Sequence, residues 1–102
     1  MRKYETLLLF SPELTTENRK EILDNLGAIV AREQGQTLML DEWGSRELAY
    51  AVNKFTRGHY VRLEYAGPSP LIAELERNIR ITDGILKFVT VKLDENFQAG
   101  EE

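Results

Sequence analysis

The order of hydrophobic patterns along the chain limits its fold more than any other feature of the sequence. Four stretches combine apolar and β-branched residues between turn residues, as strands do, and they span residues 3–10, 37–43, 58–66 and 85–93. Apolar residues recur at helical spacing over residues 16–34, and a second helix is expected to open with Ser69 as its cap and Pro70 at its first position. The predicted order is therefore β-α-β-β-α-β.

This order predicts an α+β, ferredoxin-like sandwich, in which a four-stranded antiparallel sheet carries both helices on one face. The chain has 102 residues, which is enough for one such domain. We expect the domain to span residues 1–93 and residues 94–102 (DENFQAGEE) to form an acidic tail. Gly35 is placed to end the first helix, and Thr15 or Thr16 is placed to cap its start.

Alternation along the strands predicts which side chains face the helices. In the third strand we expect one face to be core and the other to be solvated, with Val61, Leu63 and Tyr65 in the core and Tyr60, Arg62 and Glu64 in solvent. The first and fourth strands are instead apolar on both faces, and an ordinary solvated sheet face would not keep such residues. We therefore expect a protein partner to cover one patch of the helix-free face, made of Leu7, Leu9, Tyr60, Val89 and Val91.

Residues 44–53, GSRELAYAVN, have an unusual composition for a strand. Leu48, Tyr50 and Val52 alternate with small residues, which indicates packing on one side. Gly44 is expected to permit a bulge or kink. The following residues, NKFTRG, have the composition of a loop.

The sequence offers little catalytic chemistry. There is no cysteine, and the single histidine, His59, has no second ligand or base in its pattern. Acylphosphatases share this order of elements, but they need a glycine-rich anion loop, and FSPELTTENR after the first strand lacks the glycines. We therefore expect no enzyme activity, cofactor, metal or small-molecule substrate. No apolar run reaches the length of a membrane span, so a cytoplasmic location is expected.

Charge is distributed unevenly along the chain. The formal net charge is -4, yet residues 43–92 contain eight basic and five acidic side chains. Arg57-Gly58-His59-Tyr60-Val61 begins like the motif of a large RNA-binding class, but its second aromatic is out of place. Any RNA is therefore expected to be bound through phosphates and shape rather than by stacking on that motif.

The segment GSRELAYAVN resembles the signature of one family, the sixth protein of the bacterial small ribosomal subunit. Gly44, Arg46 and Asn53 fit that signature, as does the run from Glu47 to Tyr50, and Val52 stands where isoleucine is preferred. MRKYE, RGHYVRLEY and RNIRITDGILKFVTVK are also similar to corresponding segments of the family. The resemblance covers residues 1 to about 93.

The resemblance implies a structural constituent of the small ribosomal subunit. It implies binding to the central domain of small-subunit ribosomal RNA, together with the short, basic eighteenth protein of that subunit. We expect the phosphate contacts to come mainly from six cations: Arg2, Lys3, Arg46, Lys54, Arg80 and Lys87. The alternative is a homodimeric ferredoxin-like regulatory or ligand-sensing domain without an RNA role.

Overall fold

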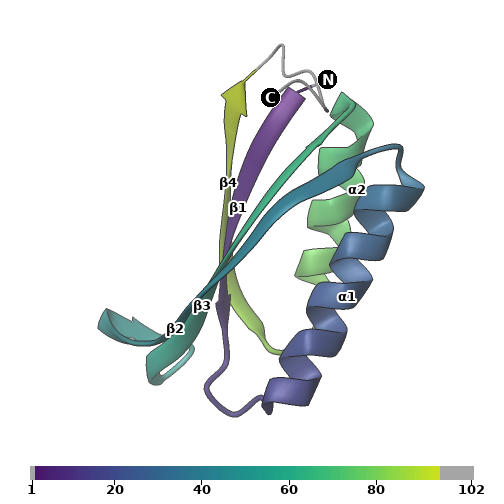
Figure 1. Ribbon diagram of the computed structural model, residues 1–102. Helices are drawn as coiled ribbons and strands as arrows, with labels where there is room; N and C mark the ends of the chain where they lie inside the picture. Colours follow the sequence, from purple (N-terminus) through teal and green to yellow (C-terminus); the bar gives the residue numbers. More distant parts are fainter. Residues whose placement is uncertain (1, 95–102) are drawn as a thin grey trace.

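The chain folds as a sheet with helices on one face only (Figure 1). The computed structural model describes residues 2–94. The elements in chain order are β1 (Arg2–Phe10), α1 (Thr16–Arg32), β2 (Gln36–Val52), β3 (Phe55–Gly67), α2 (Ser69–Arg80) and β4 (Ile85–Asp94). Neighbouring strands are antiparallel in the order β2-β3-β1-β4. The predicted ferredoxin-like fold is confirmed, and the predicted tail beyond Asp94 lies outside the described residues.

Local chemistry explains where the helices begin and end. The Oγ1 of Thr15 accepts a hydrogen bond from the Asn18 backbone N–H at 3.0 Å and so caps α1. The left-handed residue after α1 is Gln34 (φ 71°), not the predicted Gly35. The cap of α2 is Pro68, so Ser69 lies inside the helix and makes no side-chain cap, contrary to expectation.

The core lies between the helices and one face of the sheet. The core half of the predicted alternation in the third strand is confirmed, since Val61, Leu63 and Tyr65 are all buried. The solvated half is not, because Glu64 is buried as well. β1 contributes Tyr4, Leu8 and Phe10 to the same layer. The helices complete the core with Leu23, Leu26, Ile29, Val30, Leu71, Leu75 and Ile79. Burial of these apolar groups supplies most of the free energy that holds the layers together.

β2 and β3 are longer than the sequence suggested and form one extended hairpin. The predicted loop NKFTRG is instead a tight turn followed by the start of β3, because Asn53 and Lys54 both have positive φ (48° and 70°). Two left-handed residues in succession match the twist of antiparallel strands, so the strands continue up to the turn. Gly44 has φ 87° at a register shift, which confirms the predicted bulge. In Figure 1 the hairpin end projects away from the helices.

Two glycines give opposite predictions for stability. Gly27 lies inside α1 with open space around its Cα, so Gly27→Ala should raise the free energy of unfolding by about 0.5–1 kcal/mol. A Cβ on Gly35 would lie 2.7 Å from the Ala66 carbonyl oxygen, so Gly35→Ala should lower it by about 1–3 kcal/mol. Urea unfolding of both variants tests the pair, and a stabilising Gly35→Ala would contradict the described packing.

Candidate interaction surfaces

The predicted partner-binding residues all lie on the helix-free face of the sheet. Strand register places Leu7 opposite Arg62 on β3 and Val89 on β4. Val89 and Val91 are 50% and 46% exposed, and the neighbouring Leu93 is 44% exposed. Leu93 lies at a register shift between β4 and β1, because Tyr4 pairs with Lys92 and Lys3 with Asp94, so the row itself consists of Val89 and Val91. The face therefore carries an exposed apolar row along one edge strand.

Leu9 corrects one expectation about this face. It was expected to be exposed in the free protein, but it is only 2% exposed. Its register partners are Tyr60 and Lys87, so it does lie on the helix-free face. The hairpin covers it, because Leu48, Val52 and their neighbours line a cavity together with Leu9. Leu9 thus belongs to a small second apolar cluster, which sequence alternation alone does not reveal.

A charged network occupies the same face beside the apolar row. Lys3 Nζ lies 2.9 Å from Glu64 Oε1, and Arg62 pairs with both Glu64 and Glu5. Glu64 was expected in solvent but is buried between its two cationic partners. The hydrogen bond from Lys3 is the main cause that lowers the pKa of Glu64, while the bond to Glu5 is the main cause that raises the pKa of Arg62.

The six cations predicted to contact phosphate do not form one group. Arg46 and Lys54 are exposed on the hairpin, and no ion pair to either occurs within residues 2–94. Arg80 lies over the Phe88 ring at 5.5 Å from its centroid, and its Nη2 lies 3.4 Å from Glu76 Oε1. Arg80 and Lys87 both line one open cavity. These four residues belong to the hairpin, the end of α2 and the start of β4. Arg2 and Lys3 begin β1 at the opposite end of the sheet (Figure 1).

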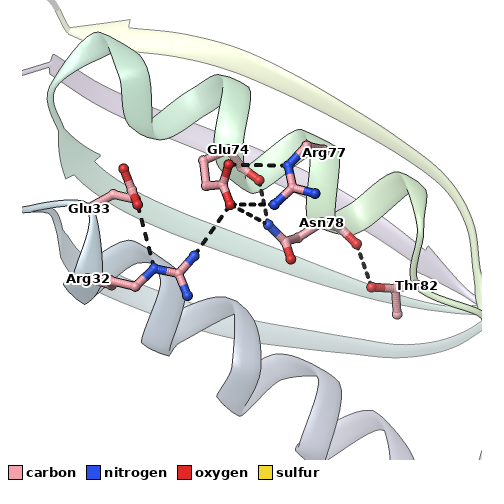
Figure 2. Close-up of polar contacts among 6 residues, drawn as sticks. All are labelled: Arg32, Glu33, Glu74, Arg77, Asn78 and Thr82. Carbon is pink, nitrogen blue, oxygen red and sulfur yellow. Dashed lines mark hydrogen bonds and ion pairs between the residues drawn. The ribbon is translucent and has the colours of Figure 1, made fainter.

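The cations on the helical face are paired with carboxylates of the helices. Figure 2 shows Glu74 of α2 at the centre of a polar cluster that joins the two helices. Glu74 accepts a hydrogen bond of 2.7 Å from Arg77 and lies 3.4 Å from Arg32 of α1. The bond from Arg77 is the main cause that lowers the pKa of Glu74. These arginines are neutralised by carboxylates of their own chain, so they are poor candidates for phosphate contacts.

Within residues 2–94, neither a metal site nor a histidine-centred catalytic site is evident. No cluster of three or more potential metal ligands occurs within residues 2–94. His59 Nε2 lies 3.4 Å from Glu42 Oε1, so its neighbour is a single carboxylate. No helix in this part of the chain is long and apolar enough to cross a membrane.

Comparison with known proteins agrees with this arrangement. The fold defines the chain as a ferredoxin-like α+β protein whose helix-free sheet face carries an exposed apolar row beside an ion network. The family model "Ribosomal protein S6" matches residues 3–92. The small ribosomal subunit protein bS6 of Desulfovibrio desulfuricans is 59% identical over 101 residues, which cover 99% of this chain and 98% of that protein. That of Oleidesulfovibrio alaskensis is 62% identical over 93 residues, with 91% and 92% covered.

A solved structure supports the same assignment. The 30S ribosomal protein S6 of Thermotoga maritima superposes with a TM-score of 0.85 at 25% identity, covering 90% of this chain and 87% of that one. The chain belongs to the ribosomal protein S6 family. It is a protein of the small subunit of the cytoplasmic ribosome, and membership of this structural family implies a non-enzymatic role.

The buried carboxylate gives a prediction about pH. Because the pKa of Glu64 is lowered in the folded chain, its ion pairs stabilise the fold above the ordinary glutamate pKa of about 4.3 and lose effect as pH falls below it. Glu64→Gln should lower the free energy of unfolding at pH 7 by about 1–3 kcal/mol, because Lys3 and Arg62 lose their shared partner.

Urea unfolding at several pH values checks this prediction. The difference between wild type and Glu64→Gln should shrink as pH falls below about 4. Glu47→Gln, at an exposed hairpin position, is the control and should change stability by less than about 0.5 kcal/mol. An equal effect of the two variants at pH 7 would show that the network does not stabilise the fold.

Proposed function

We propose that the chain binds the central domain of small-subunit ribosomal RNA together with the eighteenth protein of the small subunit. One observation carries the proposal: the helix-free face of the sheet presents half-exposed Val89 and Val91 in a row beside Leu7. A face of this composition is typical of a surface that another chain covers. Family membership supports association with ribosomal RNA.

We propose that the protein partner contacts the apolar row of β4, formed by Val89 and Val91, together with the neighbouring Leu7 and Tyr60. Leu9 is buried under the hairpin next to these residues. Burying several hundred Å² of apolar surface, at about 25 cal/mol per Å², gives a gross gain of many kcal/mol. The loss of translational and rotational freedom offsets much of this gain. We therefore expect the complex of this chain with the eighteenth protein to be weak alone and to become stable when both proteins also bind RNA.

The cations are the proposed contacts with phosphate. Arg46 and Lys54 are exposed on the hairpin, and Lys87 lies at the start of β4. Arg80, at the end of α2, is shared with Glu76 and is therefore the weaker candidate of the four. Arg2 and Lys3 would reach RNA at the other end, with Lys3 shared with Glu64. Because the surface is basic only locally, we expect the basic partner to supply much of the remaining phosphate neutralisation.

A substitution on the exposed row tests the protein contact. The buried position of Leu9 makes Leu9→Asp unsuitable, since an unpaired carboxylate there should unfold the chain. Val89→Asp should instead leave the fold intact, because Val89 is 50% exposed, and should abolish binding of the eighteenth protein in a pull-down. Leu40→Asp is the matched control: Leu40 is 48% exposed and pairs with Leu63, which places it on the other face.

Two outcomes would count against this assignment. Normal partner binding by a folded Val89→Asp variant would move the interface elsewhere on the molecule. A free protein that forms a homodimer insensitive to salt, with Val89→Asp making it monomeric, would assign the apolar row to a contact between two copies of this chain.

Charge reversal tests the RNA contact. Arg46→Glu and Lys54→Glu should each weaken binding to a central-domain transcript, and neutralisation of either residue should lower the salt slope of log K by about one unit. The controls are the α1 cations Arg19, Lys20 and Arg32. Lys20→Glu is the cleanest of them, because Arg19 and Arg32 hold contacts within the chain. Filter binding at several salt concentrations measures both quantities, and an equal loss for Lys20→Glu would overturn the assignment.

A further inference from the structure

A cavity lies on the helix-free face between the hairpin and the body of the sheet. Its volume is about 230 Å³, and it is lined by Leu9, Leu48, Ala49, Tyr50, Val52, Tyr60 and Lys87. These residues come from β1, β2, β3 and β4, so all four strands contribute to it. The cavity is separate from the helical core, because strand register places Leu9, Tyr60 and Lys87 on the helix-free face.

The cavity is a built feature of the backbone. A Cβ on Gly58 would lie 2.4 Å from Leu9 Cδ1, so the glycine leaves room for Leu9 to form the floor. The bulge at Gly44 changes the register of β2 where the hairpin begins. The two-residue turn at Asn53 and Lys54 then returns the chain, which fixes Tyr50 and Val52 above Leu9.

The residues that line this cavity are apolar or aromatic except for one lysine, so the cavity suits a flat apolar group that carries a negative charge. Lys87 is the one charged residue among those that line the cavity, and none of them is acidic. Lys87 Nζ lies 6.0 Å from the centroid of the Tyr50 ring. Tyr50 is 69% exposed, whereas the other tyrosine of the cavity, Tyr60, packs against Trp43 at 6.3 Å between centroids. Tyr50 is therefore the tyrosine of the cavity that stays largely exposed, with the Lys87 ammonium beside its ring.

We propose that this cavity binds one unstacked nucleotide of ribosomal RNA, with its base against Tyr50 and its phosphate on Lys87. The inference rests on the proposed binding of ribosomal RNA. A cavity of about 150 Å³ holds a benzene ring, so the space here is sufficient for a base. Unstacked bases are recognised in proteins by stacking on aromatic side chains.

The charges of the hairpin favour a nucleotide over the side chain of a second protein. Arg46, Lys54 and Arg57 are all exposed on the hairpin, and Glu47 is its one carboxylate between Gly44 and Gly58. A phosphate backbone that passes along the hairpin would therefore meet cations on both sides of the cavity. An apolar side chain from a basic protein would gain the same burial but would meet like charges.

The experiment is a titration of a central-domain transcript with the full chain, in the presence of the eighteenth protein. Tyr50→Ala should weaken binding roughly 5- to 150-fold, as expected for the loss of one base on an aromatic ring, and should leave the salt slope unchanged. Tyr50→Phe keeps the ring and should bind within about twofold of wild type. Ile81→Ala, at a 68% exposed apolar position outside the cavity, is the control. Lys87→Met should lower the salt slope by about one unit.

The outcomes separate this inference from the proposed function. Wild-type affinity in Tyr50→Ala, or an equal loss in Tyr50→Phe, would overturn the nucleotide site while RNA binding itself stands. Loss of binding to the eighteenth protein without RNA, with RNA affinity unchanged, would assign the cavity to a protein side chain and overturn it also. Absence of RNA binding by the wild-type complex at low salt would contradict the proposed function itself.

Discussion

The pairing of β1 with β3 on one side and β4 on the other is the constraint on which the structure depends. β1 lies inside the sheet, so its backbone groups are satisfied on both edges and its side chains must serve two faces. Tyr4, Leu8 and Phe10 point to the helices, while Leu7 and Leu9 point away from them. β1 therefore contributes side chains both to the core and to the surface on which we propose that other molecules bind.

The two faces are stabilised by different physical effects. The helical face is sealed by apolar burial and by the Glu74 cluster between the helices. The other face combines an ion network at one end, an apolar row along β4 and a covered leucine at the hairpin. Because Arg62 and Glu64 are paired within the network, the exposed valines and the hairpin cations are the groups most available to partners.

Sequence reasoning predicted the fold because local signals and global order agree here. Alternation in β3 predicted its buried residues, and the glycine at position 44 predicted the bulge. It failed where the outcome depends on contacts between distant segments. The turn at Asn53 and Lys54 was hidden by polar residues typical of loops, and the burial of Leu9 depends on a hairpin that folds back over it. Glu64 is buried for a similar reason, since its two cations come from different strands.

The central claim is that partners bind the helix-free face and leave the helical face uncovered. Methyl NMR of the chain in complex with the RNA and the eighteenth protein measures this most directly. We expect large shifts or line broadening for the methyl groups of Leu7, Val89 and Val91, and little change for Ile22 of α1 and Ile72 of α2. Large changes confined to Ile22 and Ile72, with Val89 and Val91 unaffected, would contradict the claim.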